Sequence, residues 1–106
     1  MAFARLLVAR AHAHGLAVAQ KNAAEIAPLG PGAGFDFAVT EECQVYIECG
    51  AYLAAYGRHV IEVEYTDNGV DAFVQACAAR GRQISVVLRD RDLVPAGNDE
   101  YVYRHC

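Results

Sequence analysis

The 106-residue chain carries 13 acidic and 9 basic side chains, giving a formal net charge of −4, and 55% of its residues are hydrophobic. This length fits one compact domain, or one part of a larger domain, and is too short for two. The lysines and arginines form no cluster, so neither a nucleic acid nor an anionic membrane surface is an expected partner. Polar residues interrupt every apolar run well short of the roughly 20 residues that a membrane span needs.

The first third of the chain predicts a helix, a strand and a second helix. Apolar residues recur at helical spacing from Phe3 to Ala11, and Gly15 ends this pattern. No capping residue precedes this helix, so we expect the chain to start inside an element that normally has a segment ahead of it. Residues 16–20 have the pattern of a buried strand, and residues 22–27 that of a short helix ended by Pro28.

Three more strands follow, separated by helices. Short apolar runs predict strands at residues 35–39, 60–65 and 84–88. Helical patterns occupy residues 50–56 and 70–80. A helix therefore separates every pair of strands, which requires a parallel sheet because a hairpin cannot join parallel neighbours. The remainder, from residue 90 on, is polar and aromatic and is expected to be a terminal loop.

Two α/β architectures fit this order of elements. One is a small open sandwich, and the other is about half of a (β/α)8 TIM barrel, which needs roughly 250 residues when complete. In both architectures the ligand site lies at the carboxyl ends of the strands. Here the strand ends carry Lys21, Glu41, Glu64 and Asp90, and Lys21 is the only lysine in the chain. We expect these four side chains to share one rim; the alternative is that they only mark where burial stops.

A rim with several carboxylates suits glycoside hydrolysis, in which one carboxyl group protonates the leaving oxygen and a second acts as nucleophile or activates water. Lys21 and Asn22 could hold sugar hydroxyls, and Tyr65 could stack on a sugar face. Glu42 directly follows Glu41, and we expect only one of the two to face the site. For Asp90, two roles stay open: it completes the carboxylate cluster or caps the next turn.

The four cysteines follow neither a CxxC pattern nor zinc-finger spacing, so no metal site is expected. They are Cys43, Cys49, Cys77 and Cys106. Disulfides would imply export, yet the first residues lack the pattern of a signal peptide. Two alternatives are therefore open: the thiols stay reduced, or the cysteines form disulfides and a leader is missing from this sequence. No cofactor is expected either, because the glycine-rich stretch at residues 30–34 lacks the ending of a phosphate-binding loop.

Five segments, in order along nearly the whole chain, resemble the glycoside hydrolase family 114 barrels, whose characterised members are similar to endo-α-1,4-polygalactosaminidases. The segments are residues 11–22 (AHAHGLAVAQKN), 35–43 (FDFAVTEEC), 46–49 (YIEC), 63–65 (VEY) and 88–93 (LRDRDL). This resemblance implies that the chain is the C-terminal half of a TIM barrel, a single partial domain over residues 1–106. It also implies an amino-sugar polysaccharide as the substrate and an extracellular location for the intact protein.

The resemblance implies roles for individual residues. It makes Glu41 catalytic and makes Lys21, Asn22 and Glu64 contacts to the substrate. Thr40 and Glu42 stand where the family usually has asparagine and glutamine. The resemblance further implies the disulfide pairs Cys43–Cys49 and Cys77–Cys106.

The family's other catalytic carboxylate is an aspartate on an earlier strand, upstream of anything in this sequence. We therefore expect the 106 residues alone to hydrolyse little or no substrate. Half a barrel also leaves strand edges and an inner face uncovered, which predicts self-association or pairing with a complementary half. The competing interpretation is a non-catalytic carbohydrate-binding or assembly module that uses the same rim.

Overall fold

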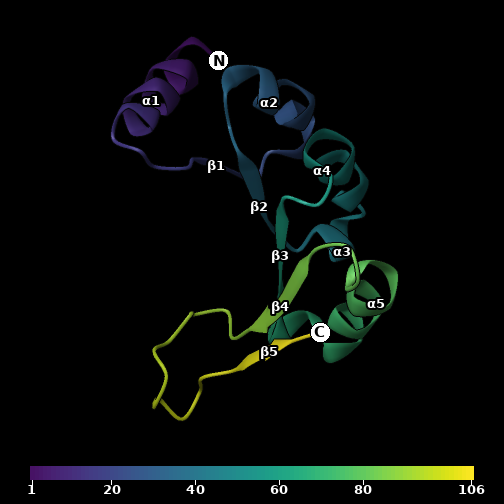
Figure 1. Ribbon diagram of the computed structural model, residues 1–106. Helices are drawn as coiled ribbons and strands as arrows, with labels where there is room; N and C mark the ends of the chain where they lie inside the picture. Colours follow the sequence, from purple (N-terminus) through teal and green to yellow (C-terminus); the bar gives the residue numbers. More distant parts are fainter.

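The computed structural model describes residues 1–106 as a curved sheet whose helices lie mainly along one side (Figure 1). The strands are β1 (Ala19–Lys21), β2 (Phe37–Glu41), β3 (Val60–Tyr65), β4 (Ser85–Arg89) and β5 (Tyr103–His105). They neighbour one another in chain order, and β1 to β4 are mutually parallel. The α/β fold with a parallel sheet, expected from the alternation of strands and helices, is confirmed.

One helix precedes the sheet, and the others connect the parallel strands. The helices are α1 (Ala2–Ala13), the 3-10 helix η1 (Ala24–Leu29), α2 (Gly30–Ala33), α3 (Cys43–Tyr46), α4 (Cys49–Tyr56), the 3-10 helix η2 (Thr66–Asn68) and α5 (Val70–Arg80). Strand β3 and helix α5 have the predicted bounds, whereas β1 is shorter than the predicted residues 16–20. No helix has both the length and the apolar character needed to cross a membrane.

The sequence predicted a terminal loop from residue 90 on, but this segment also contains a strand. Strand β5 pairs antiparallel with β4, with Tyr103 opposite Arg89. A three-residue strand is too short to show a periodic pattern, and it forms here because the outer edge of β4 offers unpaired backbone groups. The Asp90 carboxylate accepts hydrogen bonds from the backbone amides of Val94 (2.8 Å) and Val102 (3.2 Å). Asp90 thus fixes the segment between β4 and β5, which is the turn-capping role.

Alternation along the strands gives the sheet two different sides. On the side covered by helices, here called the helix side, the β2, β3 and β4 residues are almost fully buried; they are Ala38, Thr40, Glu62, Glu64, Val86 and Leu88. Most residues of the opposite side, here called the open side, are only partly buried, and Ile61 is 38% exposed. The open side includes Lys21, Val39, Glu41, Val63, Tyr65 and Arg89, which the strand register brings together. The hydrophobic core therefore lies between the sheet and helices α4 and α5.

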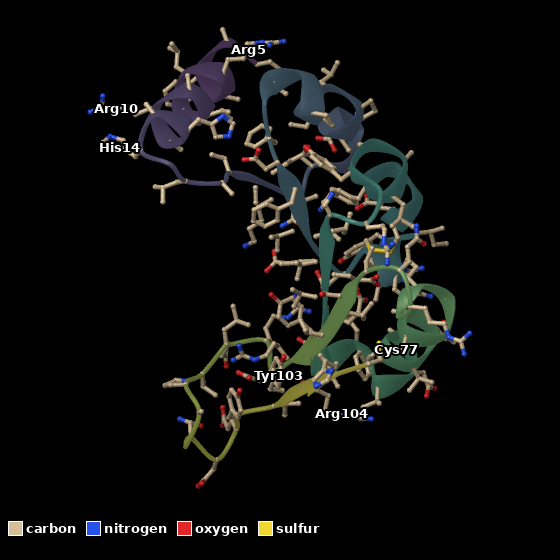
Figure 2. The ribbon with its side chains drawn as sticks, in the orientation of Figure 1. Arg5, Arg10, His14, Cys77, Tyr103 and Arg104 are labelled. Atoms are coloured by element: carbon tan, nitrogen blue, oxygen red, sulfur yellow. A yellow bond between two sulfur atoms is a disulfide. The ribbon has the colours of Figure 1, made fainter.

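Both disulfides implied by the family resemblance are present. Cys43–Cys49 joins α3 to α4 across six positions of sequence. Cys77–Cys106 joins α5 to the C-terminal residue, across 29 positions. Figure 2 shows Cys77 close to β5, the strand of Tyr103 and Arg104. The second bond therefore fastens the short β5 strand to the helix layer.

Candidate active site at the strand ends

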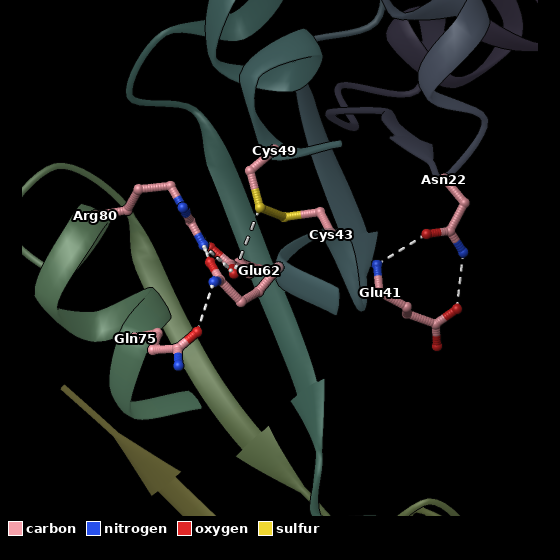
Figure 3. The surroundings of a disulfide bond; sticks show 8 residues. Asn22, Glu41, Cys43, Cys49, Glu62, Gln75 and Arg80 are labelled. Carbon is pink, nitrogen blue, oxygen red and sulfur yellow. Dashed lines mark hydrogen bonds and ion pairs between the residues drawn. A yellow bond between two sulfur atoms is a disulfide. The ribbon is translucent and has the colours of Figure 1, made fainter. Parts of the chain in front are cut away.

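Glu41, the last residue of β2, lies at the centre of the candidate site. Its backbone amide donates to the Asn22 side-chain oxygen (2.8 Å), and the Asn22 amide donates to Glu41 Oε2 (2.7 Å; Figure 3). Lys21 Nζ, at the end of β1, lies 3.3 Å from the same oxygen. The structure thus brings together the lysine, the asparagine and the glutamate that the sequence placed at one rim.

Tyr65 completes the surroundings of this carboxylate. It ends β3, and its hydroxyl donates to Glu41 Oε1 at 2.5 Å. This hydrogen bond, followed by those from Asn22 and Lys21, holds the pKa of Glu41 below its usual value although partial burial opposes the shift. Burial and the neighbouring Glu41 raise the pKa of Tyr65 to about 12. At neutral pH the pair is therefore a carboxylate and a neutral phenol, and the glutamate side chain remains 24% exposed.

A second network covers Tyr65 and was not predicted from the sequence. The Arg91 guanidinium lies 4.3 Å from the centre of the Tyr65 ring. It also donates to Glu42 (2.5 Å) and to Asp67 (2.8 Å), and Asn68 donates to Glu42 (2.7 Å). Arg91 is the main reason that the pKa values of Glu42 and Asp67 are lowered. Glu42 is thus held by Arg91 and not by the groups around Glu41, so the two adjacent glutamates bind different partners. Because Arg91 stands in an ordinary charged stretch, no spacing signal indicated its role.

Glu64 does not join Lys21 and Glu41. Its side chain is 0% exposed and lies on the helix side, the same side as Glu62. The physical reason is the two-residue period of a strand, which sends the side chains of Glu64 and Tyr65 to opposite sides. A contact between Glu64 and a substrate at the rim is therefore excluded, and of the β3 residues considered from the sequence only Tyr65 reaches Glu41.

Other parts of the chain are less suited to chemistry. The side chains of Cys43, Cys49 and Glu62 offer ligand atoms within 4.8 Å of one another, but the two sulfur atoms are bonded to each other. The largest cavity, about 770 Å³, is lined by residues 56–59 and 81–85, at the amino ends of β3 and β4. It therefore lies at the opposite end of the strands from Glu41.

A parallel sheet with a helix between successive strands and polar residues at the strand ends is typical of α/β proteins that bind ligands at this rim. The family model described as "Glycoside-hydrolase family GH114" matches residues 1–106. The chain therefore belongs to glycoside hydrolase family GH114. No curated protein matches it.

A solved structure supports the same fold. It is the crystal structure of Aspergillus fumigatus Ega3 in complex with galactosamine, which is similar to this chain with a TM-score of 0.78 and 23% sequence identity. The similarity covers 99% of this chain and 44% of Ega3, so the chain spans less than half the length of that protein. The fold of the 106 residues is accordingly part of a TIM barrel.

Proposed function

We propose that these residues form the part of a glycoside hydrolase that contributes the catalytic carboxylate Glu41 to cleavage within an α-1,4-linked galactosamine polysaccharide. The observation that carries the proposal is the surroundings of Glu41: an ionised, partly exposed carboxylate at a strand end, with donors from Tyr65, Asn22 and Lys21. The family membership and the galactosamine bound by Ega3 support the substrate class.

The chemistry requires a second carboxyl group. Glycosidases of this kind use one protonated and one ionised carboxyl group on either side of the bond that breaks. In the 106 residues by themselves, the lowered pKa keeps Glu41 ionised. A general acid must instead be protonated, which requires a raised pKa. An aspartate brought close by another barrel strand would raise the pKa of Glu41, because neighbouring like charges disfavour ionisation. The distance to that aspartate would therefore decide whether Glu41 is protonated and acts as the general acid, or is ionised and acts as the nucleophile or base.

The neighbours of Glu41 fit contacts to a sugar. Lys21 is largely exposed, with 62% of its side chain accessible, so its ammonium can turn from Glu41 to a substrate hydroxyl. The Asn22 side chain holds the Glu41 backbone and carboxylate at once, which fixes the orientation of the carboxylate. In this proposal Lys21 and Asn22 contact the substrate, and Tyr65 keeps Glu41 ionised until the substrate binds.

The test measures the release of reducing ends from α-1,4-linked galactosamine polymer. It compares the longest polypeptide that the gene encodes with the 106 residues alone. We expect activity in a polypeptide that supplies the second carboxylate, a loss of at least about 100-fold in Glu41→Gln, and little or no activity in the 106 residues alone. Glu25→Gln, which neutralises an exposed glutamate of η1 that makes no contact with Glu41, is the matched control. Full activity of Glu41→Gln would contradict the proposal, and binding without cleavage by every form would favour a non-catalytic carbohydrate-binding module.

Two further parts of the proposal concern location and association. The two disulfides support an oxidising, extracellular location. The partly exposed apolar residues of the open side, among them Ile61, support association of the 106 residues with a second copy or with complementary barrel strands. Size-exclusion chromatography tests this, and a clean monomer at every concentration would contradict it.

A further inference from the structure

The helix side of β3 carries two buried carboxyl groups that the proposed function does not use. Glu62 and Glu64 are both 0% exposed and point to the same side of the strand. Arg80, from the end of α5, donates to both oxygens of Glu62, at 2.7 and 2.8 Å. Neither oxygen of Glu64 has a hydrogen-bond partner.

The charged groups on the helix side of β3 determine whether Glu64 is protonated or ionised. Helix α5 contributes the single cation, Arg80, which is matched by Glu62. Helices α3 and α4 bring uncharged groups to this place, namely Gln44 and the Cys43–Cys49 disulfide. An ionised Glu64 would be a second buried anion with no partner, which is among the most costly arrangements in a protein interior.

We infer that Glu62 and Glu64 hold a single proton between them, and that this shared proton fixes the end of β3 that presents Tyr65 to Glu41. A protonated Glu64 donates to Glu62, whose oxygens have lone pairs left beside the Arg80 contacts. Glu64 is then a positioning residue, because it precedes Tyr65 directly and contacts no substrate. Burial, followed by repulsion from Glu62, raises the pKa of Glu64 to about 8, although the nearby backbone N–H of Gln44, which makes no regular hydrogen bond to Glu64, and the charge of Arg80 oppose the shift.

The first test is spectroscopic and uses the unaltered chain. Infrared difference spectra from pH 6 to pH 10 should show the band of a protonated carboxyl group that disappears with a midpoint near pH 8. Glu64→Gln, whose amide can donate to Glu62 in place of the proton, should lack the band. Absence of the band from the unaltered chain at pH 6 would overturn the inference, whether or not the variant folds.

The second test uses the pH dependence of unfolding. The folded chain keeps a proton on Glu64 that the unfolded chain releases above its ordinary pKa of 4.5. The contribution of this proton to the free energy of unfolding is therefore fully present below pH 4.5, and it is lost as the pH rises to the folded-state pKa of about 8. From pH 5 to pH 8, the unfolding constant of the unaltered chain should rise up to about tenfold per pH unit more steeply than that of Glu64→Gln. Glu25→Gln should keep the steeper dependence.

Parallel pH profiles for the unaltered chain and Glu64→Gln would overturn the inference. A profile that changes when calcium or zinc is added would also overturn it, because a cation would then replace the proton.

The link between Glu64 and Tyr65 is tested separately. The NMR resonances of the Tyr65 ring should move with the midpoint of the Glu64 band, although Tyr65 itself ionises far higher. In Glu64→Gln these resonances should stay fixed over the same range, and equal movement in both chains would remove the positioning role.

Discussion

Glu41 and Glu64 lie at the ends of neighbouring strands, on opposite sides of one sheet, and the two sides treat a carboxyl group in opposite ways. On the open side, donors from Tyr65, Asn22 and Lys21 surround Glu41 and lower its pKa. On the helix side, neither oxygen of Glu64 has a hydrogen-bond partner, and burial raises its pKa to about 8. Whether a carboxyl group at a strand end is ionised therefore depends on the hydrogen-bond donors around it, and not on its position at the end of the strand.

The arginines of the two sides differ in the same way. The Arg80 side chain is 12% exposed and holds the fully buried Glu62, whereas the Arg91 side chain is 44% exposed and holds the exposed Asp67 (52%) and the largely buried Glu42 (14%). Buried ion pairs are costly to break, and exposed pairs contribute little. The comparison indicates that the helix side supplies most of the stability of the fold, while the open side holds the groups suited to chemistry.

The most damaging substitution should be Arg80→Met. It leaves Glu62 buried without a counter-charge, and breaking such a pair by removing one partner costs about 3–5 kcal/mol. Urea unfolding at pH 7 measures the loss. Arg82→Met changes an exposed arginine two positions away and should alter stability by less than about 0.5 kcal/mol. Equal effects of the two variants would contradict the division between the two sides.

The disulfides should rank next, in the order of the loops that they close. In the chain-entropy account, a bond across the 29 positions between Cys77 and Cys106 contributes about 3.6 kcal/mol, and one across the six positions between Cys43 and Cys49 about 2.2 kcal/mol. Paired alanine substitutions, followed by thermal unfolding, test this order. A larger loss from the Cys43–Cys49 pair would show that packing around α3 outweighs loop closure.

The sequence predicted the fold well where its pattern was long. The six residues of β3 and the eleven of α5 have the predicted bounds, because each carries a complete periodic signal. Strand β5 was missed because three residues carry no such signal and because its partner, β4, lies elsewhere in the chain.

The site was predicted in part. Lys21, Asn22 and Glu41 meet because parallel strands end at one rim. Glu64 was misplaced, although the alternation of strand side chains already separates it from Tyr65. Arg91 could not be predicted, since its place over the Tyr65 ring depends on the path of the chain after β4.

Tyr65→Phe should have a smaller effect, confined to the open side. It removes one hydrogen bond to an ionised group, worth about 1.5 kcal/mol at neutral pH because Glu41 is partly exposed, and raises the pKa of Glu41. Because the folded-state pKa of Glu41 is lowered, its contribution to stability is present above pH 4.5 and is lost as the pH falls through the folded-state value. The difference between the two chains should therefore shrink in acid. NMR titration of Glu41 and urea unfolding at several pH values measure both effects.

Arg91→Gln should have the smallest effect on stability, below about 1 kcal/mol, because Arg91 and Asp67 are exposed to water and Glu42 keeps its hydrogen bond from Asn68. The pKa values of Glu42 and Asp67 should rise, since Arg91 is the main cause of their lowering. High salt should reduce the stability difference further by screening the exposed charges. Unfolding in low and high salt, with NMR titration of the two carboxyl groups, provides the measurement. A large loss that salt does not change would mean that the Tyr65 ring depends on Arg91 for its position, and the open side would then contribute to stability as the helix side does.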